Sequence, residues 1–118
     1  MGIAGWNPKV KFAGAKDYFD AHVKKHQKEP DRWASAFAYA ALQILEESVG
    51  KVGLDRARIK AHLDSIEFST VVGPVRFTKG WNQATPGMVG QWQKNEFEVI
   101  WPPERATALA VVPKPTWS

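Results

Sequence analysis

Phe68-Ser69-Thr70-Val71-Val72-Gly73-Pro74-Val75-Arg76-Phe77 is the segment that divides the chain into a helical part and a strand-forming part. Its first five residues are rich in β-branched side chains, which favours a strand, and residues 75–77 alternate as an edge strand does. Gly73 widens the choice of φ, and Pro74 restricts the residue before it, so the pair suits a defined bend between two packing units. We therefore expect Gly73 and Pro74 to form a hinge.

Before this segment, the sequence predicts about three helices. The first covers residues 13–27, where apolar side chains recur at helical spacing. Asp31 is placed as the N-cap of a second helix over residues 32–48, whose apolar face is so broad that we expect other elements to sandwich it. Asp55 can cap a third helix, whose apolar side carries Ile59, His62, Leu63 and Ile66.

After the dividing segment, the pattern predicts a C-terminal β-hairpin and short strands. Residues 88–93 and 96–101 read as two strands joined at Lys94-Asn95, and residues 107–112 as one more short strand. We expect one edge of this hairpin to lack a partner within the chain.

Composition excludes several classes of function. The chain has 118 residues, 44% of them hydrophobic, and a formal net charge of +4 with the two signs interspersed, so no basic arm for nucleic acid is expected. The absence of cysteine excludes disulfides and thiolate chemistry. We find neither an export signal nor an apolar run of the roughly 18 residues that span a bilayer. No cofactor is expected.

Catalytic motifs are also missing from the pattern. Ser35 and Ser48 lie within a predicted helix, and there is no glycine-flanked nucleophile elbow and no phosphate-binding loop. His22 and His26 share one helix face and could hold a divalent metal, but Val23 stands where a metalloprotease has its glutamate. We favour a solvated helix face over a metal site, and we do not expect an enzyme.

The tryptophans allow two interpretations. Trp81, Trp92 and Trp101, with basic residues nearby, could form a stacking platform for single-stranded nucleic acid or a sugar. Alternatively, Trp92 and Trp101 pack the hairpin onto the helices. Because positive charge is not clustered, we favour the second interpretation.

Read in order, several motifs resemble the last part of the leucine/isoleucine/valine-type periplasmic solute-binding proteins of ABC transporters and their aromatic-acid-binding relatives. They are Trp6-Asn7-Pro8, Phe19 to Val23 followed by Pro30, Phe37-Ala38-Tyr39-Ala40-Ala41, Gly53-Leu54-Asp55, Thr70 to Phe77, Gln91-Trp92-Gln93 and Trp101-Pro102. The resemblance covers nearly the whole chain.

This resemblance implies an α/β chain that is a fragment of the type I periplasmic-binding-protein fold, in which two lobes close on a small solute. Residues 1–67 would belong to one lobe and residues 68–118 to the other, with the crossing near Gly73-Pro74. The function implied is non-catalytic: binding an amino acid or a related small, possibly aromatic, carboxylate in the periplasm and delivering it to a membrane permease. The chain would hold about the last third of such a receptor.

Tyr39 and Phe37 are the ligand-binding residues that the resemblance implies. Tyr39 stands where the family's helix can turn a phenol toward the cleft between the lobes, and aromatic walls with a few polar tips are typical of small-solute pockets. The alternative is a core tyrosine whose hydroxyl has found a partner. Phe37 fits a core position better than a pocket.

A second hypothesis is a stand-alone self-associating domain without a solute. Under either hypothesis we expect the isolated chain to form a homodimer, because the apolar surface of residues 32–48 exceeds what the chain itself can cover.

Overall fold

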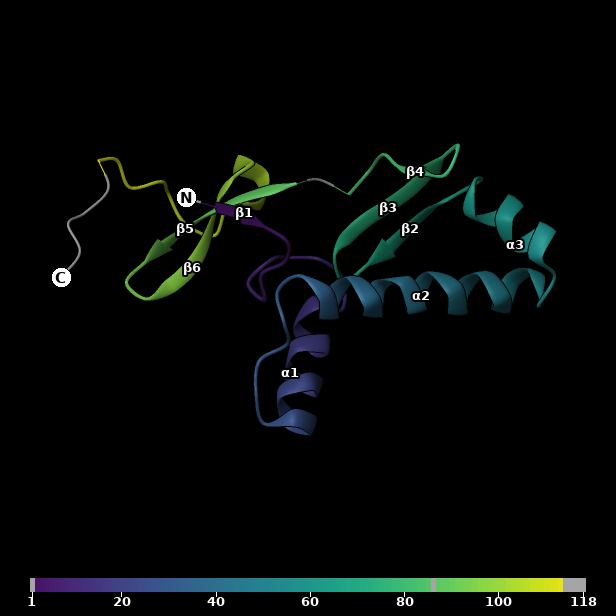
Figure 1. The fold of residues 1–118 in the computed structure, drawn as a ribbon, viewed down its shortest axis with the longest axis horizontal. Helices are drawn as coiled ribbons and strands as arrows, with labels where there is room; N and C mark the ends of the chain where they lie inside the picture. Colours follow the sequence, from purple (N-terminus) through teal and green to yellow (C-terminus); the bar gives the residue numbers. More distant parts are fainter. Residues whose placement is uncertain (1, 86, 114–118) are drawn as a thin grey trace.

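A computed structural model describes residues 2–85 and 87–113. In this part of the chain the fold is a small mixed α/β domain with three helices and two three-stranded antiparallel sheets (Figure 1). The helices are α1 (Ala15–His26), α2 (Ala34–Val52) and α3 (Arg56–Leu63). The strands are β1 (Gly2–Ala4), β2 (Glu67–Thr70), β3 (Gly73–Thr78), β4 (Trp81–Asn82), β5 (Met88–Gln93) and β6 (Glu96–Trp101), followed by the short 3-10 helix η1 (Pro103–Arg105).

Asp55 is the N-cap of α3, as the sequence predicts, whereas the N-cap position of α2 is Trp33 and not the predicted Asp31. Asp31 Oδ1 accepts hydrogen bonds from the amides of Trp33, at 2.8 Å, and Ala34, so it supplies acceptors that the first turn of α2 lacks. Asp55 Oδ1 accepts from the Arg58 amide at 2.8 Å at the start of α3. The predicted first helix is confirmed as α1. Its buried residues are Ala15 and Tyr18, whereas Phe19 and Val23 of the predicted apolar spacing are half-buried.

The dividing segment forms a hairpin. Glu67–Thr70 pairs antiparallel with the start of β3, and the register places Thr70 opposite Gly73 and Ser69 opposite Pro74. The chain therefore reverses direction at Val71 and Val72, two residues before the predicted bend, and Gly73 and Pro74 lie inside a paired strand. Since β4 pairs with the other side of β3, the expectation of an edge strand at residues 75–77 is wrong.

The C-terminal hairpin has the predicted strands and the predicted turn. Lys94 and Asn95 both have positive φ, 50° and 65°, as a two-residue hairpin turn of this handedness requires. The edge of β5 is not free, however, because Gly2–Ala4 pairs with Met88–Gly90 and makes the sheet order β1-β5-β6. Three residues are too few to show a strand period, so β1 could not be predicted from local periodicity.

Residues 107–112 are not a strand, contrary to expectation. They lie beside the hairpin in an irregular conformation, held largely by side chains. The side-chain amide of Gln91 donates through Nε2 to the Val111 carbonyl and accepts through Oε1 from the Val111 N–H, each at 2.9 Å. Gln93 Nε2 donates to the Leu109 carbonyl at 2.8 Å. We call residues 107–111 the strap.

The core lies where the N-terminal entry, α2 and the β2-β3 hairpin meet. Trp6 is 1% exposed, and its indole N–H donates to the Val71 carbonyl at 2.8 Å across 65 residues of sequence. The buried apolar residues around it are Val10, Ala15, Tyr18, Ala36, Ala40, Ile44, Phe68, Val71, Val72, Val75, Met88 and Val99.

Only one side of α2 is covered. The sheet of β2 and β3 lies along this helix in Figure 1, and the buried positions follow a single line of Ala36, Ala40, Ile44 and Ser48. Leu42 is 64% exposed and Leu45 is 48% exposed on the other side. The expectation that α2 is sandwiched is therefore wrong. Within residues 2–85 and 87–113, no helix or strand covers its second face.

The shape agrees with a partly covered core. The molecule measures 56 × 33 × 18 Å, with a radius of gyration of 16.5 Å, whereas a compact domain of this length has about 13.5 Å. The chain exposes 8470 Å², against roughly 6,400 Å² for a typical monomer of its mass.

The assignment of residues 1–67 and 68–118 to two lobes remains a prediction. Strands β2 and β3 share the core with α1 and α2, while β1, from the start of the chain, joins the C-terminal hairpin. Among the helices of residues 2–85 and 87–113, none has the length and apolarity of a bilayer-spanning segment.

We predict that Trp6→Phe lowers the free energy of unfolding by about 1–3 kcal/mol, because the buried Val71 carbonyl loses its donor. Chemical denaturation followed by circular dichroism measures the change. Trp81→Phe is the matched control, since Trp81 is 74% exposed, and we expect little change for it. Equal effects of the two substitutions would contradict the role assigned to Trp6.

Candidate functional site

Tyr39, the predicted ligand-binding residue, lies in an aromatic cluster between α1 and α2. Its ring centroid is 4.8 Å from that of Tyr18 on α1, with the two planes tilted by 40°. Tyr18 in turn meets Trp6 edge to face at 5.5 Å. The cluster therefore links the exposed Tyr39 to the core through one buried ring.

The two tyrosines of this cluster differ in exposure. Tyr18 is 8% exposed, and burial raises the pKa of its phenol, an effect that the nearby Ser35 hydroxyl partly offsets. Tyr39 is 43% exposed and so can present its ring edge and hydroxyl to a molecule outside this chain. A rigid buried ring behind a half-exposed one is a suitable wall for a planar or apolar ligand group.

Phe37 does not lie with Tyr39. Two residues along a helix are separated by about 200° around its axis, so the two side chains leave α2 on opposite sides. Phe37 is 39% exposed, at the border of the uncovered face of α2, and it is not the core residue that the sequence favoured. The structure therefore does not bring the two predicted ligand-binding residues together.

The predicted hinge residues line a shallow hollow of about 270 Å³. Gly73 and Pro74 form one side of it, and Lys11 and Phe12 of the entry segment form another. Gly73 has φ +99°, and a Cβ there would lie 3.0 Å from the ring of Phe12, so both its conformation and its neighbour require glycine. The bend between lobes predicted at this point remains a prediction.

The His22 and His26 rings are neighbours on α1, with centroids 4.6 Å apart and planes tilted by 42°. His22 Nδ1 lies 3.1 Å from the Lys28 carbonyl oxygen. Within residues 2–85 and 87–113, no group of three or more His, Cys, Asp or Glu side chains could hold a metal ion.

The tryptophans of the strands are exposed. Trp92 and Trp101 are 65% and 56% exposed, so the interpretation that they pack the hairpin onto the helices is wrong. Trp92 instead meets Phe97 of the neighbouring strand edge to face at 5.4 Å.

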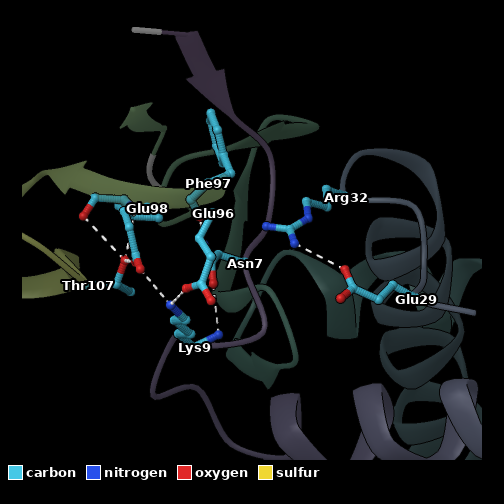
Figure 2. A network of polar contacts seen from close by, with 9 residues as sticks. Asn7, Lys9, Glu29, Arg32, Glu96, Phe97, Glu98 and Thr107 are labelled. Carbon is cyan, nitrogen blue, oxygen red and sulfur yellow. Dashed lines mark hydrogen bonds and ion pairs between the residues drawn. The ribbon is translucent and has the colours of Figure 1, made fainter. Parts of the chain in front are cut away.

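A polar network that the sequence did not predict joins the entry segment to the C-terminal hairpin (Figure 2). Asn7, 1% exposed, donates to the Phe97 carbonyl at 2.6 Å and accepts from the Lys9 amide at 2.8 Å. Lys9 Nζ lies 2.5 Å from a carboxylate oxygen of both Glu96 and Glu98. The only sequence signal was the turn-forming dipeptide Asn7-Pro8.

The charges of this network shift the ionisation of its members. The Lys9 ammonium, together with the Thr107 hydroxyl, holds the pKa of the Glu98 carboxyl below its ordinary value of 4.5. The carboxylates of Glu96 and Glu98 raise the pKa of Lys9 above 10.5. The network has the geometry of a structural clasp and not of an acid–base pair, because both partners are fully ionised near neutral pH.

Comparisons with protein families, with curated proteins and with solved structures found no match to this chain. We therefore infer the function from the residues and their geometry.

We predict that Glu98→Gln destabilises the fold more near pH 7 than near pH 3. The pKa of Glu98 is lower in the folded state than in the unfolded state, so the ionised carboxylate stabilises the fold above about pH 4.5. This contribution is lost as the pH falls through the lowered pKa. Urea denaturation at both pH values measures the difference, with the exposed Glu47→Gln as the control. An equal loss of stability at pH 7 and pH 3 would show that the carboxylate charge is not involved.

Proposed function

We propose that this chain is the C-terminal segment of an ABC-transporter solute-binding protein with the type I periplasmic-binding-protein fold. Its role is to bind an amino acid or a related small, possibly aromatic, carboxylate in the periplasm and to deliver it to a membrane permease. The observation that carries the proposal is the uncovered apolar face of α2, because a receptor of this family covers that helix with a sheet from its preceding residues.

Contacts between the motifs support this proposal. Trp6 of the Trp-x-Pro entry donates to Val71 of the Thr70-to-Phe77 segment, and Asn7 of the same entry donates to the C-terminal hairpin. Two of the motifs that carry the family resemblance therefore contact each other in this fold.

The position of Tyr39 gives the proposal a residue to test. Its ring packs against the buried Tyr18, and 43% of Tyr39 is exposed to solvent. In the proposed receptor this ring lines the cleft, and its hydroxyl contributes one hydrogen bond to the solute.

We expect Tyr39→Phe to weaken solute binding by about 0.5–1.5 kcal/mol, the contribution of one hydrogen bond, with little change in melting temperature. Isothermal titration calorimetry with L-leucine, L-phenylalanine and 4-hydroxybenzoate as probes measures the dissociation constants. Trp81→Phe, which changes an exposed ring outside this cluster, is the control.

Native mass spectrometry of the purified chain, alone and together with the product of the upstream reading frame, gives a second test. A retained small molecule, or a complex with an upstream segment, supports the proposal. If no solute is retained, no probe binds and no upstream segment associates, the proposal is wrong.

A self-associating interaction domain without a solute is the second candidate. The same uncovered face of α2 favours it, because a second copy can supply the apolar surface that the chain lacks. A dimer that retains no solute and binds no probe would favour this candidate over a transport receptor.

A further inference from the structure

The uncovered face of α2 consists of two parallel ridges of apolar side chains. Residues four apart on a helix line up in such ridges, which fit into the grooves of a second helix. One ridge is Ala34, Ala38 and Leu42, and the other is Ala41, Leu45 and Val49. Val49 is half-buried and the other five are exposed. We call these six residues the open face.

The chain as a whole exposes about 2,000 Å² more than a typical monomer of its mass, and the open face is one part of this excess. A standard interface takes about 800 Å² from each partner, which is less than the excess. Two exposed leucines on one helix face also fit the apolar centre that such interfaces have.

We infer that, when this chain is alone, a second copy covers the open face that the proposed receptor would cover with its preceding sheet. The two α2 helices are then antiparallel about a two-fold axis between residues 41 and 42. In this register Ala38 lies opposite Leu45 of the second copy, Ala41 opposite Leu42, and Ala34 opposite Val49. Each contact thus pairs a small side chain with a large one, so the first ridge of each helix fits the second ridge of the other. Such self-complementarity is what a two-fold interface requires.

The charges around the open face are compatible with this arrangement. Glu46 is the charged residue of α2 nearest the open face. The register places it opposite Phe37 of the second copy, so the two Glu46 side chains are separated by nine helical residues, or about 13 Å along the axis. This exceeds the screening length of about 8–10 Å at moderate salt, so they repel only weakly.

Disulfide trapping tests the register directly, because the chain contains no cysteine of its own. We expect an equimolar mixture of Ala38→Cys and Leu45→Cys chains to form a cross-linked heterodimer under mild oxidation. Neither variant should cross-link efficiently alone, because its two copies lie about 10 Å apart along the axis, beyond the roughly 7 Å that a disulfide can span. Leu54→Cys, 85% exposed outside the open face, is the control.

Each outcome of the trapping experiment decides the inference. Preferential formation of the 38–45 heterodimer supports it. Efficient cross-linking of Ala38→Cys chains with one another indicates parallel helices and overturns it, as does cross-linking no greater than that of the Leu54→Cys control.

Sedimentation equilibrium at micromolar concentration provides an independent measurement. We expect Leu42→Lys to weaken dimerisation more than about a hundredfold, because the contact occurs twice in a two-fold dimer. Leu54→Lys should leave the dimer intact. The double variant Ala38→Leu with Leu45→Ala exchanges small and large residues and should dimerise, whereas Ala38→Leu alone should not. A monomeric unmodified chain overturns the inference without bearing on solute binding, which calorimetry measures separately.

Discussion

The backbone of Val71 is the point on which the rest of the structure depends. This residue is 1% exposed in the turn between β2 and β3, where neither of its peptide groups has a strand partner. Its carbonyl accepts from the Trp6 indole, and its N–H donates to the Gln43 side chain of α2 at 3.1 Å. Because an unpaired buried peptide group is costly, these two side chains fix the hairpin to the entry segment on one side and to the long helix on the other.

The sequence predicted those parts of the fold that short-range chemistry decides. Asp55 caps α3, and Asp31 accepts from amides just before and at the start of α2, because a carboxylate can satisfy amides two or three residues ahead. Lys94-Asn95 closes a hairpin because both residues adopt positive φ. The errors concern contacts between distant segments. Gly2–Ala4 pairs with β5, which lies more than 80 residues further along the chain. This pairing and the partial covering of α2 depend on contacts between distant segments, which local periodicity does not reveal.

The candidate site shows the same division. Tyr39 was identified through a motif, and the structure gives it a half-exposed position against Tyr18. Tyr18 itself was missed because a tyrosine in an amphipathic helix has no distinguishing pattern. Phe37 belongs to the same motif of the family resemblance, but the helical rotation of about 200° between it and Tyr39 places the two on different sides of α2. The clasp of Asn7, Lys9 and Glu98 joins residues about 90 positions apart and left only a turn signal in the sequence.

The strap has a consequence for the order in which this molecule comes apart. Between paired strands, the backbone hydrogen bonds break only when the strands separate, whereas the bonds of Gln91 and Gln93 to residues 109 and 111 break when a side chain changes rotamer. Residues 109–111 can therefore detach while β5 and β6 stay paired, and their amide hydrogens should exchange with solvent much earlier than those of the hairpin. Residues 109–111 thus open as a separate unit when the hydrogen bonds of Gln91 and Gln93 break.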